Sequence, residues 1–237
     1  MRVDAGARTV VLLRHGHSDW NLTDRFTGWT DIALSSAGVG EAEQAGRALG
    51  RAGLRFDEVH VSRLRRTRQT AIALLAVTGS AGVPIHSTWR LNERHYGALQ
   101  GLRKTEIFTL WGEERSRAWW RGYHTPPPAL TPDDPRHPRF DRRYADLDPA
   151  WLPTGESLRD CQRRMLPYWR DVLAPRIAAG RRLLVISHGN TLRGLVMHLE
   201  QLSADAMEKV EIPSGVPFIY RFSADLGVID KAWVDVA

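Results

Sequence analysis

Residues 183–191 of the chain read LLVISHGNT, and they repeat the plan of residues 10–18, VVLLRHGHS. In each stretch an apolar run is followed by one polar residue and then by His-Gly. A short apolar run of this kind is typical of a strand that is buried on both faces of a parallel sheet. The carboxyl ends of parallel strands meet at one edge of the sheet, where α/β proteins bind ligands. We therefore expect His15 and His188 to face one crevice.

Apolar runs alternate with helical patterns along most of the chain. Besides the two runs above, strands are predicted at 59–62, 217–222 and 228–234, and helices at 35–53, 70–77, 157–180 and 191–201. This alternation is typical of a sheet covered by helices on both faces. The sequence therefore predicts an α/β fold, three-layer αβα with a mostly parallel central sheet, in a single domain over residues 1–237.

One stretch does not fit the alternation. Residues 125–138, TPPPALTPDDPRHP, are rich in proline and cannot form a helix interior or a central strand. The preceding residues 102–121 are helical in pattern and rich in tryptophan. We predict a lid or insertion at about 102–155.

The composition is that of an ordinary globular protein. Of 237 residues, 43% are hydrophobic and 25% are charged. Because Cys161 is the one cysteine, a single chain can form neither a disulfide nor a cysteine-based zinc site. No apolar run approaches the length of a signal-peptide core or a spanning helix, so we expect a cytoplasmic protein.

The formal net charge of +6 has two interpretations. Scattered arginines on solvated faces explain it without any function. Alternatively, the arginines bind an anionic small substrate, because guanidinium groups pair with phosphates. A non-catalytic module that binds anions or nucleic acid is a competing hypothesis, although no long basic tail appears.

The alternation of His15, His17 and Asp19 raises three possibilities. A metal site needs further ligands close by, and position 20 is Trp. Histidines of a surface loop are the plainest alternative, but the matched pair at His188 weakens it. A nucleophilic imidazole must be neutral and aimed at a phosphoryl group, and adjacent cations such as Arg14 favour both conditions. We favour the nucleophile and expect no metal.

Four segments carry a resemblance to a known family: RHGHSDWN at 14–21, FTGWTDIALSSAG at 26–38, LNERHYGALQG at 91–101 and SHGNTLRGLV at 187–196. They resemble the 2,3-bisphosphoglycerate-dependent phosphoglycerate mutases of the histidine phosphatase superfamily. The similarity runs from about residue 9 to about residue 222. The second and third segments are specific to the mutases, whereas RHG alone indicates only the superfamily.

The resemblance implies roles for particular residues. His15 would be the phosphorylated nucleophile, with Arg14, Arg66 and His188 around the phosphoryl group, and Glu93 would donate and accept the proton. The residues implied to bind substrate are Asn21, Thr27, Gly28, Arg94, Tyr96, Lys104, Arg121, Gly189 and Asn190.

The sequence departs from the family in three places. His17 stands where the family usually has Glu, which changes the charge beside His15. Trp120-Arg121 stands where the family carries two arginines, and losing one charge-assisted contact costs about 1.5 to 3 kcal/mol. The chain also stops at KAWVDVA, without the mobile tail of typical bacterial members, which favours leakage of phosphate to water.

The resemblance implies interconversion of 3-phosphoglycerate and 2-phosphoglycerate in glycolysis and gluconeogenesis. Phospho-His15 would be the intermediate, 2,3-bisphosphoglycerate the primer, and a homodimer the assembly. The alternative is a phosphomonoesterase that uses the same site and releases phosphate to water.

Overall fold

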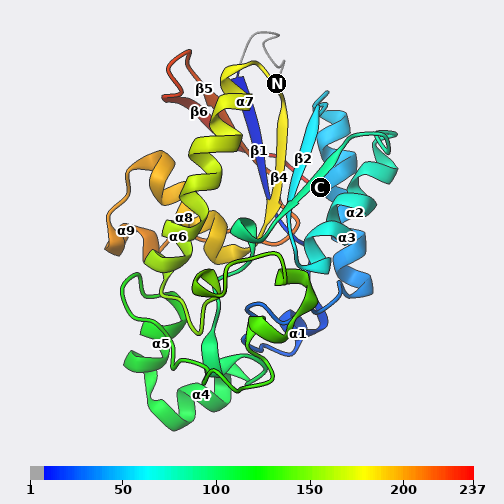
Figure 1. Cartoon of the computed structure of the whole chain (residues 1–237). Helices are drawn as coiled ribbons and strands as arrows, with labels where there is room; N and C mark the ends of the chain where they lie inside the picture. The colour runs from blue at the N-terminus through cyan, green and yellow to red at the C-terminus, as the bar shows by residue number, and fades with distance from the viewer. Residues whose placement is uncertain (1–7) are drawn as a thin grey trace.

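The computed structural model describes residues 8–237, and a six-stranded sheet lies at its centre (Figure 1). The strand order is β3-β2-β4-β1-β5-β6. Neighbours from β3 to β1 pair in parallel, whereas β5 is antiparallel to both β1 and β6. Among the described strands only β5 therefore runs against the others, which confirms a mostly parallel sheet. The strands are β1 Arg8–Arg14, β2 Glu58–Ser62, β3 Ile85–Thr88, β4 Leu183–Ser187, β5 Phe218–Phe222 and β6 Val228–Trp233.

The apolar run of β1 is continuous because the strand is buried on both faces. Val10 and Leu12 pack into one hydrophobic cluster, and Val11 and Leu13 into a second cluster on the opposite face. Successive side chains of a strand point to opposite faces, so a fully apolar strand serves both clusters. β4 is divided between the same two clusters.

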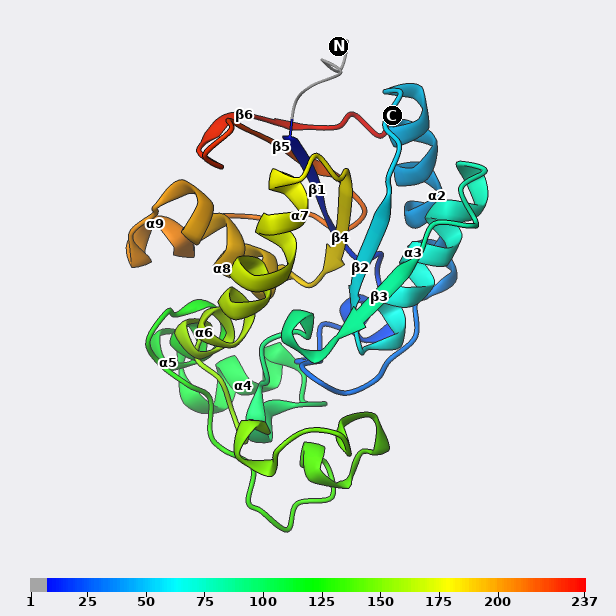
Figure 2. The ribbon, with the colours of Figure 1, turned by 45° about the horizontal axis from the view of Figure 1, so that its top comes forward.

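Helices cover both faces of the sheet (Figure 2). Helices α2, Ser36–Arg51, and α3, Arg65–Val77, pack on one face. Helices α6, Leu158–Tyr168, α7, Ala174–Ala178, and α8, Gly189–Glu200, pack on the other. The predicted three-layer αβα fold is confirmed.

One detail of the predicted elements is wrong. The helix expected over 157–180 is interrupted by a π-helical segment, Trp169–Leu173. Pro167 and Pro175 lack the N–H that a regular α-helix requires at their positions. The hydrogen-bond pattern between them is therefore that of a π-helix. Helix α3 begins at Arg65, ahead of the apolar stretch 70–77, so Arg66 lies in its first turn.

The predicted insertion lies across the carboxyl ends of the central strands (Figure 1). It contains α4, Lys104–Trp111, and α5, Glu113–Arg121, followed by short 3₁₀ turns at 138–140, 142–144 and 149–151. The short helices α1, Asp19–Leu22, and α9, Ala204–Glu208, and two further 3₁₀ turns at 89–91 and 97–99 complete the elements. Within residues 8–237 no helix has both the length and the apolar character needed to cross a membrane.

Candidate active site

The two His-Gly pairs meet at the carboxyl edge of the sheet. The parallel register pairs Arg14 with Ser187, and the backbone N–H of His15 donates to Ser187 O at 3.1 Å. The rings of His15 and His188 consequently lie edge to face, with centroids 4.8 Å apart. The sheet register alone thus brings together two histidines that are far apart in the sequence.

The hydrogen bonds of His15 determine its tautomer. Its Nδ1 lies 2.7 Å from Gly16 O, and a carbonyl oxygen only accepts, so Nδ1 carries the proton. Nε2 therefore holds the lone pair. Burial lowers the pKa of His15 well below its usual value, and the neighbouring Arg66 and Arg14 lower it further. The imidazole is neutral at physiological pH, with Nε2 as an available nucleophile.

Arg66 lies between the two histidines. Its Nε is 3.2 Å from His15 Nε2 and 3.3 Å from His188 Nδ1, while its two Nη atoms donate to Gly28 O and Thr30 O at 2.8 and 2.9 Å. The side chain is 1% exposed. The loop at 28–30 thus fixes a buried cation against the nucleophile.

His188 is held in the complementary tautomer. Because Arg66 only donates, His188 Nδ1 accepts and Nε2 carries the proton, which points to Ser62 Oγ at 2.9 Å. Ser62 Oγ is in turn 2.8 Å from Thr67 Oγ1, which donates to Leu64 O. Burial, followed by Arg66, lowers the pKa of His188. Hydrogen bonds of the β2–α3 connection thus fix the ring.

Arg14 supplies a second cation beside the nucleophile. Its Nη1 donates to Ile212 O at 2.9 Å, and its guanidinium lies against Gly189, where an added Cβ would be 3.7 Å from Cζ. Its Nε is buried and has no hydrogen-bond partner within residues 8–237. An anion in the crevice would satisfy this donor.

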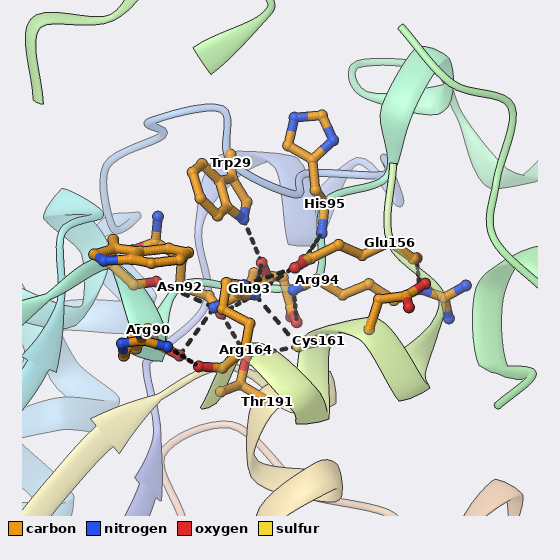
Figure 3. Close-up of polar contacts among 12 residues, drawn as sticks. Trp29, Arg90, Asn92, Glu93, Arg94, His95, Glu156, Cys161, Arg164 and Thr191 are labelled. Atoms are coloured by element: carbon orange, nitrogen blue, oxygen red, sulfur yellow. Dashed lines mark hydrogen bonds and ion pairs between the residues drawn. The ribbon is translucent and has the colours of Figure 1, made fainter. Parts of the chain in front are cut away.

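Glu93 is held by its backbone and by one carboxylate oxygen. Its Oε1 accepts from the backbone N–H of Arg94 at 2.8 Å and of Asn190 at 3.2 Å. Its carbonyl accepts from Trp29 Nε1 at 2.6 Å and from Arg164 Nη2 at 3.1 Å, as Figure 3 shows. Across the described chain Oε2 makes no hydrogen bond, so it remains available to move a proton.

A buried ion pair lies behind Glu93. Arg164 and Glu156 contact at 2.6 Å, with side chains 6% and 5% exposed (Figure 3). Arg164 also donates to the carbonyls of residues 89, 90, 92 and 93, and Glu156 accepts from the backbone of His95. Burying two charges is favourable only when such additional bonds satisfy them. The pair fixes the backbone that carries Glu93.

One pocket joins most of the predicted residues. Its lining contains six cationic side chains but only two carboxylates, as expected for an anionic ligand. The predicted residues that line it are Arg14, His15, Asn21, Thr27, Gly28, Arg66, Glu93, Tyr96, Lys104, Arg121, Gly189 and Asn190. His188 lies beneath it, in contact with Arg66 and with the ring of His15.

Arg94 does not reach this pocket, contrary to expectation. Its guanidinium is buried and donates to the carbonyls of Trp120, Gly122, Thr125 and Glu156 at 2.6 to 3.4 Å. A buried guanidinium needs hydrogen-bond acceptors, and backbone carbonyls at the end of α5, after it and at residue 156 supply them. Arg94 therefore attaches the insertion to the segment that carries Glu93.

Gly16, between the nucleophile and His17, serves close packing. Its backbone N–H donates to Thr70 Oγ1 at 3.3 Å. A Cβ at Gly16 would lie 2.1 Å from Gly38 O, in the first turn of α2. Glycine is required here because two backbone segments pack closely.

His17 does not line the pocket. Its Nδ1 lies 2.7 Å from Glu41 Oε1, and its backbone N–H donates to Glu41 Oε2. It is the last of the causes that lower the pKa of His15, after burial and two arginines. The side chain that departs from the family thus pairs with Glu41 of α2 rather than facing the pocket.

In the outer part of the pocket, two cations lie over an aromatic ring. Lys104 Nζ lies 4.8 Å and Arg121 Cζ 5.5 Å from the centroid of Trp120. Lys104 also pairs with Asp24. Where the family carries an arginine, Trp120 thus provides an aromatic ring over which Lys104 and Arg121 lie.

The lining includes residues that the sequence interpretation missed: Arg25, Phe26, Arg193, Glu211 and Ile212. Arg193 had a signal, because it follows Asn190 by three residues on α8 and so shares its helix face. Glu211 had none, since it lies in an irregular segment after α9. In the described part of the chain no group of three or more His, Cys, Asp or Glu is placed to hold a metal ion.

Comparison with known proteins adds to this geometry. Residues 10–232 match the histidine phosphatase superfamily (branch 1). A protein of Nitratidesulfovibrio vulgaris (strain Miyazaki F), named 2,3-bisphosphoglycerate-dependent phosphoglycerate mutase, is 51% identical over 218 residues, which cover 92% of this chain and 88% of that protein.

Two solved structures are similar in fold. Mycobacterial glucosyl-3-phosphoglycerate phosphatase in complex with VO3 matches with a TM-score of 0.68 and 26% identity, over 90% of this chain and 92% of that one. Mycobacterial hydrolase 1 matches with a TM-score of 0.73 and 24% identity, over 98% and 100%. The family match over residues 10–232 and the sequence identity to its sequence relatives show that the chain belongs to the histidine phosphatase superfamily, branch 1, and within it to the 2,3-bisphosphoglycerate-dependent phosphoglycerate mutase family.

Proposed function

We propose that this protein interconverts 3-phosphoglycerate and 2-phosphoglycerate through a phosphohistidine at His15, as an enzyme of glycolysis and gluconeogenesis. The observation that carries the proposal is the fixed tautomer of His15. Its Nδ1 is bound to Gly16 O, which leaves a neutral Nε2 beside Arg66 at the inner end of a cationic pocket. The sequence relatives support the mutase over a phosphatase, since they carry the mutase name at 49 to 51% identity.

The pocket suits 2,3-bisphosphoglycerate as primer, because several donors surround the nucleophile and the buried Nε of Arg14 has no acceptor among residues 8–237. When bound, the primer would supply the phosphoryl group that charges His15. His15 Nε2 forms the N–P bond as the P–O bond of the donor breaks, and Glu93 gives a proton to the leaving oxygen. In the return transfer Glu93 takes the proton of the attacking hydroxyl, and the N–P bond breaks.

The surrounding residues stabilise the charge that develops in both transfers. Arg14, Arg66 and His188 would neutralise the phosphoryl oxygens in transit. Lys104, Arg121 and Tyr96 would bind the other phosphate and the carboxylate of the substrate, with Asn21, Thr27, Gly28, Gly189 and Asn190 near the phosphates. We place the activity in the cytoplasm; the homodimer implied by the family remains a prediction.

One experiment tests the proposal. With chelator present, 3-phosphoglycerate is supplied with and without trace 2,3-bisphosphoglycerate, and both 2-phosphoglycerate and free phosphate are followed. We expect fast, primer-dependent formation of 2-phosphoglycerate, lost in His15→Ala and retained in His86→Ala, a control at an exposed histidine of β3. Free phosphate as the main product would instead indicate the phosphomonoesterase.

A further inference from the structure

The pocket contains a carboxylate that the proposed chemistry does not use. Glu211, in the irregular segment between α9 and β5, lines the pocket together with Arg121 of α5. Its Oε1 lies 2.7 Å from Arg121 Nη1. An acidic group at an anion-binding mouth opposes the binding of an anion, so its presence needs an explanation.

Residues 208–211 hold the guanidinium group of Arg121. Besides Glu211, its Nε donates to Glu208 O at 3.1 Å and its Nη2 to Val210 O at 3.0 Å. Every nitrogen of the guanidinium therefore has a partner in residues 208–211. These contacts hold the end of helix α5 against the end of α9 and the segment that follows it.

The two members of the ion pair differ in their freedom to move. The side chain of Glu211 is 76% exposed, whereas that of Arg121 is 14% exposed. Because the carboxylate of Glu211 is largely solvated already, Glu211 can leave Arg121 for solvent at small cost. An incoming anion would take its place on Arg121.

The negative charge of Glu211 also acts on Arg193, another cation that lines the pocket. Burial, followed by the like charge of Arg121, lowers the pKa of Arg193 to about 10, and Glu211 opposes this shift. Arg193 Nη1 donates to Asn190 Oδ1 at 3.0 Å. The carboxylate therefore acts on two of the cations that line the site.

We propose that Glu211 is a specificity-determining residue, an internal anion that occupies Arg121 until the substrate displaces it and that selects against ligands of high negative charge. The inference rests on the proposed function, since it takes phosphoglycerates as the ligands. Repulsion by a carboxylate grows with the charge of the ligand. Glu211 would therefore weaken binding of a bisphosphoglycerate more than binding of a monophosphoglycerate.

Glu211→Gln tests this inference, with Glu208→Gln as the matched control. Glu208 offers only its backbone carbonyl to Arg121, and its side chain makes no hydrogen bond or ion pair within the described residues. In Glu211→Gln we expect the KM for 3-phosphoglycerate to fall roughly two- to fivefold, the range that an exposed ion pair permits. The Kd for 2,3-bisphosphoglycerate, measured by calorimetry, should fall by a larger factor, and both changes should shrink at high salt.

Glu208→Gln should keep the wild-type KM and Kd. Unchanged or weaker binding in Glu211→Gln, or an equal change in both variants, would overturn the inference. Failure of the proposed function appears separately, as a wild-type enzyme that forms no 2-phosphoglycerate. In that case the calorimetric Kd for 2,3-bisphosphoglycerate still decides the role of Glu211.

Discussion

Arg66 offers the sharpest test of the site, because one guanidinium contacts both histidines. Its Nε lies 3.2 Å from His15 Nε2 and 3.3 Å from His188 Nδ1, and both Nη atoms are bound to carbonyls of the 28–30 loop. A lysine at this position keeps the charge, but all of its N–H donors are on one nitrogen. It therefore cannot contact both histidines and the loop carbonyls as the planar guanidinium does. Glutamine removes the charge as well.

The expected losses follow from these contacts. One charge-assisted hydrogen bond lost from the transition state costs about 1.5 to 3 kcal/mol. That energy corresponds to a roughly 10- to 150-fold decrease in kcat/KM, which we expect for Arg66→Lys. Arg66→Gln should lose more, because the cation that neutralises the phosphoryl oxygens is absent.

The pH profile separates charge from geometry. After burial, Arg66 is the largest cause of the lowered pKa of His15. Removing this cation raises that pKa, so the acidic limb of kcat/KM, where protonated His15 cannot attack, should move to higher pH in Arg66→Gln but not in Arg66→Lys. The assay is kcat/KM for 3-phosphoglycerate from acid to neutral pH. Wild-type kcat/KM in Arg66→Lys, or an unmoved acidic limb in Arg66→Gln, would refute the reasoning.

Two further predictions concern stability. Gly38→Ala should lower the free energy of unfolding by roughly 1 to 3 kcal/mol, because its Cβ would lie 2.0 Å from His17 O. Gly40→Ala, which meets open space on the same helix, should raise it by about 0.5 to 1 kcal/mol, and equal urea midpoints would contradict this pair. The free energy of unfolding should also fall as pH drops from about 6.5 toward 4. Burial lowers the pKa of His60 to about 4, so the unfolded chain binds a proton there that the folded chain does not, at about 1.4 kcal/mol per pH unit. His60→Gln should reduce this slope in acid denaturation series, and an unchanged slope would count against the assignment.

The sequence predicted the inner site well, because local patterns determine it. Apolar runs that end in His-Gly define two buried strands, and parallel pairing of β1 with β4 then brings His15 beside His188. The resemblance to the family added Arg66 and Glu93, which the residues alone did not distinguish from solvated side chains. The structure places both in the same pocket.

The outer site depends on contacts between distant segments, which no local pattern records. Glu93 and Arg94 are neighbours in one motif, yet Glu93 lines the pocket and Arg94 is buried behind it. The direction of the Arg94 side chain follows from the carbonyls of residues 120, 122 and 125, which accept its hydrogen bonds. Glu211 is brought to the mouth by a segment without periodicity, so sequence reasoning had no means of finding it.

The inner and outer halves of the pocket differ in how firmly their cations are held. Arg66 is fixed by loop carbonyls and two buried histidines, whereas Arg121 is held at the mouth partly by an exposed carboxylate that can leave. A mutase must keep its phosphohistidine aligned while the bisphosphorylated intermediate turns to offer its other phosphate. Rigid contacts around the transferred group allow the alignment, and exchangeable contacts at the mouth allow the turn. A mouth held as rigidly as the inner site would slow that turn, whereas the exposed side chain of Glu211 is a partner of Arg121 that the intermediate can displace.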